Sequence, residues 1–398
     1  MTKPSEDLAE GTIIRRPTSV ELFRYFLSLG TTGFGGPIAL VGYMEREFVD
    51  HRHWVTRQEL KDGLAFAQLA PGPLAAQLAI YLGWLCSGVR GATMSAIAFV
   101  APSFLMVLAL AVLYLRYDGI TWLQGAFYGI GAAVIAIIGR SAFKLVRATL
   151  ATDGLMWAIF AISAVTTAWT ESEKAWLFIV SGVLAMGLRG TRRSSNPTVW
   201  SLTVGPGIMP RGLWAIPEVA SGAGVLLTVF LYFAGAGLFV FGSGLAIVPF
   251  LHGGVVQQHH WLTERQFLDA VAVALVTPGP VVITVAFIGY LVAGLGGAIV
   301  AAAGVFAPVY FITILLAPHY ERLKSDVRVR AFVDGVTASA TGAIAGAAYV
   351  LGRRAIVDVP TLLIAAVTLV LLLRAKKLPE PLVILGAGLA GVGMTGLR

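Results

Sequence analysis

FRYFLSLGTTGFGG (residues 23–36) and FLYFAGAGLFVFGS (residues 230–243) open two copies of one unit, and each copy continues to a Pro-Gly-Pro. A constant offset of 207 residues aligns 23–73 with 230–280 without a gap, and 18 of the 51 paired positions are identical. A hydrophobic chain made of two copies of one unit, each interrupted by Gly and Pro at matching positions, is typical of a membrane transporter.

The composition indicates a membrane protein. The 398 residues are 57% hydrophobic and 13% charged, with a mean hydropathy of +0.81, whereas soluble domains carry roughly 25% charged residues. Residues 270–318 contain no Asp, Glu, Lys or Arg, and a bilayer can accommodate such a stretch. The first 20 residues are polar, so we expect no cleaved signal peptide. The net charge of +8 is explained by basic loops facing the cytoplasm, and we expect no nucleic acid partner.

The chain divides into a cytoplasmic tail (1–20), a first repeat (21–189), a cytoplasmic linker (190–221) and a second repeat (222–398). Equivalent loops differ in charge: 171–174 is acidic where 374–380 is basic. This contrast favours inverted repeats, although the pair Arg353 and Arg354 opposes it. The predicted fold is an all-α polytopic membrane protein with two homologous, inverted repeats and broken or re-entrant helices.

Each Pro-Gly-Pro follows a short predicted helix. Thr56 with Glu59, and Thr263 with Gln266, fit the capping box, so we expect helices over 56–70 and 263–277. Fifteen residues advance ~22 Å, less than the ~30 Å hydrocarbon core. Each helix should therefore stop inside the membrane, where the last Pro of the motif starts another helix.

A helix that starts inside the membrane presents unpaired amides and the positive end of its dipole. Two such ends form an anion site without a buried lysine. Glycines of FGG and FGS allow close backbone approach, and four polar side chains could add hydrogen bonds: Gln77, Ser243, Thr277 and Thr284. The alternative interpretation is that these Gly and Pro residues only permit helix packing or kinks.

Several charged residues are candidates for coupling or gating. Asp62 and Asp269 occupy the same position in the two copies. They are interpreted either as solvated interfacial carboxylates or as proton carriers. Arg140 and Lys144, one helical turn apart, either snorkel to the membrane edge or line an anion path. Two further candidates have no charged counterpart in the second copy: Glu45 and Arg46.

The sequence lacks the motifs of an enzyme or an ATP-driven pump. The single cysteine, Cys86, excludes an internal disulfide and a cysteine metal cluster. No P-loop, HExxH or nucleophile elbow occurs. We therefore expect no catalytic residue, no metal site and no cofactor.

LGTTGFGGPIALVGYMEREFV (29–49) and QLAPGPLAAQLAIYLG (68–83), echoed by FGSGLAIVPF (241–250) and TPGPVVITVAFIGYLVAG (277–294), resemble the chromate ion transporter family. The resemblance covers essentially the whole chain, as in the long two-domain members. It assigns the substrate contacts to the motif residues Phe34, Gly35, Gly36, Pro37, Pro71, Gly72, Pro73, Phe241, Gly242, Ser243, Pro278, Gly279 and Pro280. The second copy departs from FGGP at Ser243 and Gly244, which argues against equal contributions from the two copies.

The resemblance implies a multi-pass permease of the bacterial inner membrane that exports chromate, is driven by an ion or proton gradient, and confers chromate resistance. A sulfate or other oxyanion permease, and an uncoupled anion channel, are the alternative functions. The bilayer and the transported anion are the expected partners. The sequence leaves open whether the protein is a monomer or a homodimer.

Overall fold

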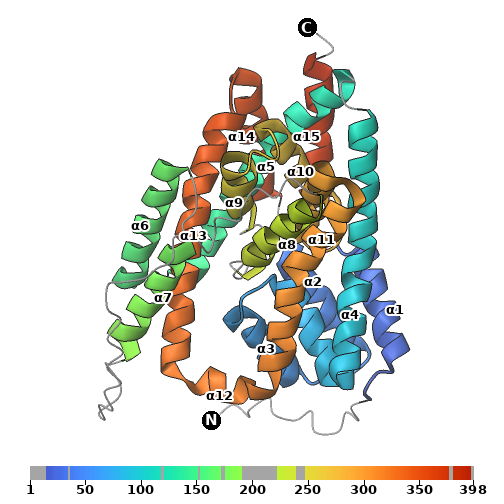
Figure 1. Ribbon diagram of the computed structural model, residues 1–398, viewed down its shortest axis with the longest axis vertical. Coiled ribbons are helices and arrows are strands. Elements are labelled where there is room, and N and C mark those ends of the chain that lie inside the picture. Colours follow the sequence, from blue (N-terminus) through green and yellow to red (C-terminus); the bar gives the residue numbers. More distant parts are fainter. Residues whose placement is uncertain are drawn as a thin grey trace, which may run out of the picture.

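The computed structural model describes residues 15–34, 36–117, 121–150, 153–171, 175–190, 222–238, 247–375 and 380–395. Most of the tail, nearly all of the linker, Gly35 and the FGS motif (Phe241, Gly242 and Ser243) lie outside these residues. All regular structure in the described residues is helical, and the helices form two entwined sets (Figure 1). The predicted all-α fold is confirmed.

The first repeat contains a short broken pair of helices, a helical hairpin and three further helices. Their bounds are α1 Ser19–Thr32, α2 Gly36–Glu45, the π-helix η1 Arg46–His51, α3 Arg57–Leu69, α4 Leu74–Arg116, α5 Thr121–Thr149, α6 Gly154–Thr170 and α7 Ala175–Gly190.

The second repeat has the same order of main helices, with the short elements η4, η5 and α12 in addition. Their bounds are α8 Gly222–Leu238, α9 Ile247–His252, the π-helix η3 Gly253–Gln258, α10 Glu264–Val276, η4 Val281–Ile283, α11 Thr284–Leu316, η5 Ala317–His319, α12 Tyr320–Ser325, α13 Val327–Ala355, α14 Val359–Arg374 and α15 Glu380–Thr395. Helices α3 and α10 correspond at both ends with the offset of 207 residues, and α5 and α13 with an offset of 206. The internal similarity therefore extends past the aligned motif.

The two repeats run in opposite directions. In Figure 1, α4 leads toward the end of the molecule marked C, whereas its counterpart α11 leads down to α12 at the end marked N. Helix α13 then returns from α12 toward the C end (Figure 1). This arrangement matches the predicted inverted repeats.

The repeats exchange the long helices α5 and α13, each of which packs against the C-terminal helices of the other repeat. Helix α13 packs against α6 and α7 of the first repeat, while α5 packs against α14 and α15 of the second. Glycines permit the contact: an added Cβ on Gly342 would lie 2.3 Å from the Phe160 carbonyl, and one on Gly129 would lie 2.0 Å from the Ala387 carbonyl. Small residues at such crossings let helix backbones approach closely within a membrane.

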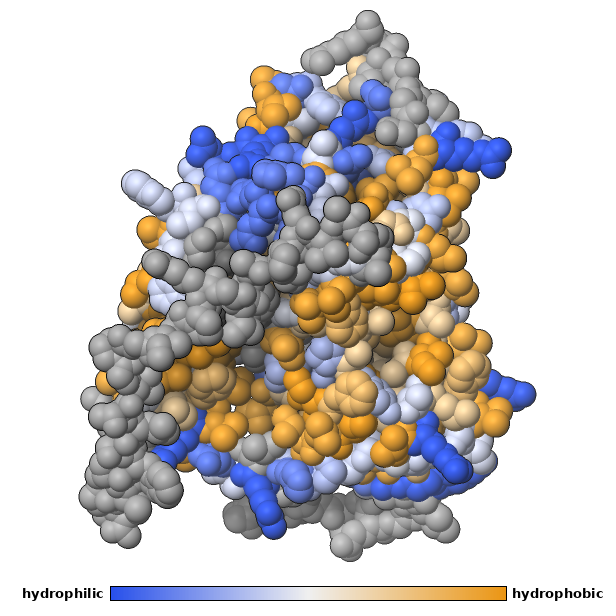
Figure 2. All heavy atoms as spheres, in the orientation of Figure 1, coloured by the Kyte–Doolittle hydropathy of each residue, from blue (hydrophilic) through white to orange (hydrophobic). Residues whose placement is uncertain are grey.

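Four helices among the described residues are long and apolar enough to cross a bilayer, namely Leu74–Arg116, Gln124–Arg147, Val281–His319 and Val327–Ala355. Figure 2 shows hydrophobic surface across the middle of the molecule and hydrophilic surface toward both ends. The protein is therefore a multi-pass membrane protein. Each repeat also ends in two short apolar helices, α6 and α7 in the first and α14 and α15 in the second.

Helix α3 and the first part of α4 form a re-entrant hairpin. The predicted capping boxes are present at Thr56 and Thr263, and α3 and α10 end directly before the Pro-Gly-Pro motifs. Residues 74–86 return beside α3, because the Tyr81 ring stacks on Phe66 at 5.3 Å. Leu60 near the start of α3 and Cys86 at the end of this returning arm belong to one hydrophobic cluster. The Pro-Gly-Pro is thus the tip of a hairpin whose ends share one side of the membrane.

A sharp turn inside α4 separates the returning arm from a long crossing arm, residues 89–116. Ser87 and Gly88 leave helical geometry, with φ +60° and ψ −150° at Gly88. An added Cβ on Gly91 would lie 2.1 Å from the Gly83 carbonyl, although residues eight apart in a straight helix are separated by ~12 Å. The same turn recurs at Ala293 and Gly294 in α11.

Replacing Gly88 by Ala should destabilise the protein through backbone strain alone. No atom lies within 4 Å of the added Cβ, but φ is +60°, a conformation that costs a non-glycine residue about 1–3 kcal/mol here. Thermal unfolding in detergent should show a lower midpoint for Gly88→Ala. The control is Gly139→Ala, at a helical glycine that also has no atom within 4 Å; equal midpoints for the two variants would contradict the turn.

Candidate functional site

Helices α1 and α2 form the broken pair of the first repeat, and their tip is at the FGG motif. Helix α1 ends at Thr32, α2 begins at Gly36, and Gly36 has φ +73°. The chain folds back after this tip, since the Tyr25 ring on α1 lies 5.2 Å from the Phe48 ring on η1. The first repeat therefore inserts two tips, one at FGG and one at Pro-Gly-Pro.

These tips meet the Pro-Gly-Pro tip of the second repeat. The Gly279 amide donates to the Gly33 carbonyl at 2.9 Å. Together the three tips enclose a cavity of about 10 Å³, lined by Pro37, Leu40, Pro73, Leu74, Ala75, Gly279, Pro280, Val281 and Val282. The expectation that the helix breaks come together is met for the described residues. A volume of this size holds about one water molecule.

Each Pro-Gly-Pro glycine packs against the crossing arm of the other repeat. An added Cβ on Gly279 would lie 1.9 Å from the Ser103 hydroxyl, and one on Gly72 would lie 2.8 Å from Val309. Ser103 and Val309 are equivalent positions, separated by 206 residues. The Ser103 hydroxyl also donates to the Gly30 carbonyl at 3.3 Å. The two contacts are therefore related by the internal symmetry of the protein.

The chemistry of the space between the tips suits an anion. Leu74 and Ala75 lie in the first turn of α4, and Val281 and Val282 in the first turn after the second tip. Amides in a first turn have no acceptor within their own helix and carry the positive end of the dipole. The two starts thus direct positive potential toward one small space, with no charged side chain lining it.

The predicted polar side chains behave differently from one another. Gln77 is fully buried and donates to the Pro71 carbonyl at 2.7 Å, while its other amide atom, Oε1, has no partner among the described residues. Thr277 and Thr284 donate instead to backbone carbonyls within one turn, at 2.7 Å and 2.8 Å. Of the three, Gln77 is the one with a buried polar atom that has no partner among the described residues. Phe34 remains 38% exposed.

The two equivalent aspartates have different surroundings. Asp62 pairs with Lys324 of α12 at 3.3 Å. Asp269 is buried and accepts a hydrogen bond from Tyr114 at 2.8 Å. Interpreting both residues as solvated interfacial carboxylates is therefore wrong for Asp269. Both partners come from the other repeat, so each aspartate links the repeats.

The remaining charged candidates lie away from the cavity. Arg140 pairs with Glu380 at 3.4 Å, and the positive charge of Lys144 also attracts the Glu380 carboxylate. Glu45 pairs with Arg57 at 2.9 Å. Arg46 lies over the Tyr43 ring, with its guanidinium carbon 5.7 Å from the ring centroid. None of these four residues lines the space between the tips.

Sequence reasoning missed Ser103 and Lys324. Ser103 lies in the uniform apolar run of α4 and has Val309 as its counterpart, so no pattern distinguishes it. Lys324 lies in the short basic helix α12, and a single ion pair to a distant helix leaves no trace in the sequence. Tyr114 was detectable, because Tyr320 matches it at the offset of 206 residues.

The family model described as chromate transporter matches residues 20–186 and 227–392. This chain belongs to the chromate transporter family. It is 52% identical to a chromate transport protein of Cupriavidus metallidurans, over 98% of this chain and 97% of that protein. It is 50% identical to a probable chromate transport protein of Synechococcus elongatus, over 94% of each chain. A chromate transport protein of Pseudomonas aeruginosa is 31% identical over 93% of this chain and 91% of the relative. No solved structure matches.

Replacing Gly279 by Ala should disrupt the contact between the tip and the crossing arm. The added Cβ would overlap the Ser103 hydroxyl, and overpacking of this kind costs about 1–3 kcal/mol. We expect a lower unfolding midpoint and at least a tenfold loss of transport, both partly restored by adding Ser103→Ala. Gly131→Ala is the control, because no atom lies within 4 Å of its added Cβ. Failure of Ser103→Ala to restore either quantity would contradict the contact.

Proposed function

We propose that this protein exports chromate from the cytoplasm across the bacterial inner membrane as a secondary active transporter, and so confers chromate resistance. The observation that carries the proposal is the meeting of both Pro-Gly-Pro tips with the FGG tip, where Gly279 is hydrogen-bonded to Gly33, in a member of the chromate transporter family. Chromate is a tetrahedral dianion, and helix starts at these tips supply donors for its oxygens.

The residues proposed to contact the anion are those at or beside the tips. They are Phe34, Gly35, Gly36, Pro37, Pro71, Gly72, Pro73, Gln77, Pro278, Gly279, Pro280 and Thr284, with Phe241, Gly242 and Ser243 proposed from the motif alone. Gln77 contributes its unpartnered amide oxygen as an acceptor for a protonated or hydrated species, and its side chain can rotate to donate. For Thr284 to contact the anion, its hydroxyl must release the Val281 carbonyl and donate to the anion instead.

The cavity of about 10 Å³ is too small for an oxyanion, so the tips must separate during transport. Separation breaks the Gly279–Gly33 hydrogen bond and draws the crossing arms away from the glycines. Alternating access proceeds by movement of one repeat against the other around a site near the bilayer midplane. The structure is accordingly interpreted as a closed state of the cycle.

Charge balance supports coupling to a second ion. Each helix start carries roughly half an elementary positive charge, so two starts compensate about one charge of a dianion. The remaining negative charge favours cotransport or exchange with a proton or other cation. An uncoupled channel is the alternative function, and it needs no such ion.

We propose that the end of the molecule containing α3 and α12 faces the cytoplasm. Lys324 of α12 and Asp62 of α3 pair there, and basic side chains gather at that end: Arg16, Arg52, Arg57, Lys61, Arg322 and Arg328. Positively charged residues favour the cytoplasmic side of inner-membrane proteins.

Everted vesicles test the function. Vesicles containing the protein should accumulate chromate against its gradient when a pH gradient is imposed, and vesicles without it should not. Sulfate in excess should compete weakly; full competition with faster sulfate uptake would favour the sulfate permease. Flux that never runs uphill would identify an uncoupled channel.

The buried Asp269 should be more important for coupling than Asp62. Asp269→Asn keeps an acceptor for Tyr114 but removes the ionisable group, so uptake driven by a pH gradient should fall at least tenfold. Chromate exchange at equal pH should change less than threefold. Asp62→Asn, the matched variant in the first repeat, should retain most of the driven uptake. Equal losses in the two variants would contradict different roles.

A further inference from the structure

A polar groove runs along α1 in the first repeat. Its volume is about 340 Å³, far larger than the cavity between the tips. Along α1 it is lined by Tyr25, Ser28, Thr32 and Gly33, which recur on one face at helical spacing. The distance along the helix axis from Tyr25 to Gly33 is ~12 Å. We call this cavity the α1 groove.

The inner end of the α1 groove reaches the tips. Gly33 lines the groove, and its carbonyl is the atom that accepts the Gly279 amide hydrogen bond. Gly33 therefore lies between the groove and the tip of the second repeat, and its hydrogen bond to Gly279 is the one that must break when the tips separate.

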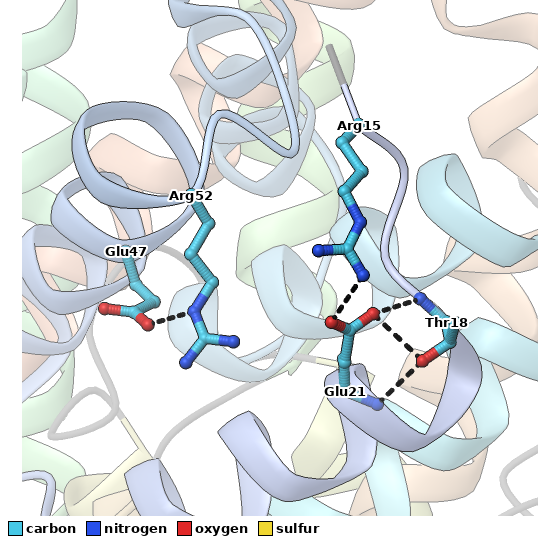
Figure 3. Close-up of polar contacts among 5 residues, drawn as sticks. All are labelled: Arg15, Thr18, Glu21, Glu47 and Arg52. Atoms are coloured by element: carbon cyan, nitrogen blue, oxygen red, sulfur yellow. Dashed lines mark hydrogen bonds and ion pairs between the residues drawn. The ribbon is translucent and has the colours of Figure 1, made fainter.

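The outer end of the α1 groove carries a cation without an ion pair among the described residues. Arg46, Glu47 and His51 line it. Glu47 accepts a hydrogen bond from the Arg52 guanidinium (Figure 3), which compensates its charge. Arg46 makes no ion pair with any described residue, and its charge faces the groove beside Tyr43.

The neighbouring carboxylates are paired with cations other than Arg46. Glu21 is held by Arg15 and by the amide and hydroxyl of Thr18 (Figure 3). These hydrogen bonds from Thr18, and then the charge of Arg15, lower the pKa of Glu21, so it stays ionised and paired. Glu45 and Asp50 share Arg57, so these three residues together carry one net negative charge. Arg46 is nevertheless the cation that lines the groove, and none of these carboxylates forms an ion pair with it.

In the wall of the groove, one buried donor has no acceptor. The Tyr25 hydroxyl is buried and has no hydrogen-bond partner among the described residues. A buried polar group without a partner costs free energy, and an oxyanion in the groove would supply the missing acceptor.

The described part of the second repeat closes the equivalent space. Tyr232, the counterpart of Tyr25, donates to the Phe250 carbonyl at 3.0 Å and stacks on the Phe250 ring. The counterparts of Arg46 and Glu47 are Gly253 and Gly254. An added Cβ on Gly254 would lie 2.1 Å from the Tyr232 hydroxyl, so the ring fills the position that is open in the first repeat.

We propose that the α1 groove is the path by which an oxyanion reaches the tips from the end of the molecule containing α3. Arg46 attracts the dianion at the mouth, and the Tyr25 hydroxyl donates to it on the way to Gly33. This inference rests on the proposed function, and it adds a specific binding path that lies in one repeat.

The test is chromate uptake in everted vesicles, measured as KM and maximal rate. Arg46→Gln should raise the KM about tenfold with little change in maximal rate. Increased salt should reduce the difference in KM between this variant and the wild type, because salt screens the charge of Arg46. Arg46→Lys should recover most of the affinity. The control Arg24→Gln removes an exposed cation from α1 that does not line the groove, and it should leave the KM unchanged.

Tyr25→Phe removes the hydroxyl while keeping the ring that packs on Phe26, Phe48 and Trp54. We expect a KM at least threefold higher with an unchanged or higher unfolding midpoint, since a purely structural hydroxyl would not alter the KM. If the wild type transports chromate and both variants keep its KM, the groove is not the path and the proposed function stands. If wild-type vesicles take up no chromate, the proposed function itself fails.

Discussion

The hydrogen bond from the Gly279 amide to the Gly33 carbonyl joins the two repeats where both are broken. It requires two helix tips from opposite repeats to approach to backbone contact, and glycine permits this by lacking a Cβ. With a side chain at Gly279, the tip would collide with Ser103 of the crossing arm. The position of the helix starts, and hence of their unpaired amides, depends on this approach.

The bilayer explains why the breaks are confined to this place. Backbone amides without partners are costly in hydrocarbon, so irregular backbone at membrane depth survives when it is buried in protein or lines a polar space. Here Gly72, Pro73, Gly279 and Pro280 are all buried. The surrounding helices shield the tips from lipid, and the exchange of α5 and α13 between repeats keeps those helices together.

The sequence predicted the parts of the fold that local chemistry determines. The capping boxes at Thr56 and Thr263 and the stops at Pro-Gly-Pro placed α3 and α10 within one residue. The turns at Gly88 and Gly294 were not predicted, because Gly within an apolar run is also compatible with a continuous transmembrane helix. The exchange of helices between repeats was not predicted either, since it depends on contacts such as Gly342 with Phe160 that no local pattern encodes.

In the candidate site, too, some features follow from the local sequence and others depend on contacts between distant parts of the chain. The motif residues at the tips follow from repetition, whereas the different surroundings of Asp62 and Asp269 follow from partners more than 150 residues away in the chain, Lys324 and Tyr114. Repetition identifies equivalent positions but says nothing about what each position faces after folding. Residues that are identical in the two copies can therefore have different environments.

Two copies of one unit need not perform the same task once they face opposite sides of a membrane. The first copy keeps Arg46 and an open groove beside Tyr25, while the second has Gly253 and fills the equivalent space with Tyr232. Conversely, the carboxylate of the first copy is paired with a lysine, while that of the second is buried against a tyrosine. If anion access belongs to one repeat and ion coupling to the other, movement of the tips between them is the step that must link the two. The shared Gly279–Gly33 contact lies where such a link is required, because neither repeat can open its tip without breaking it.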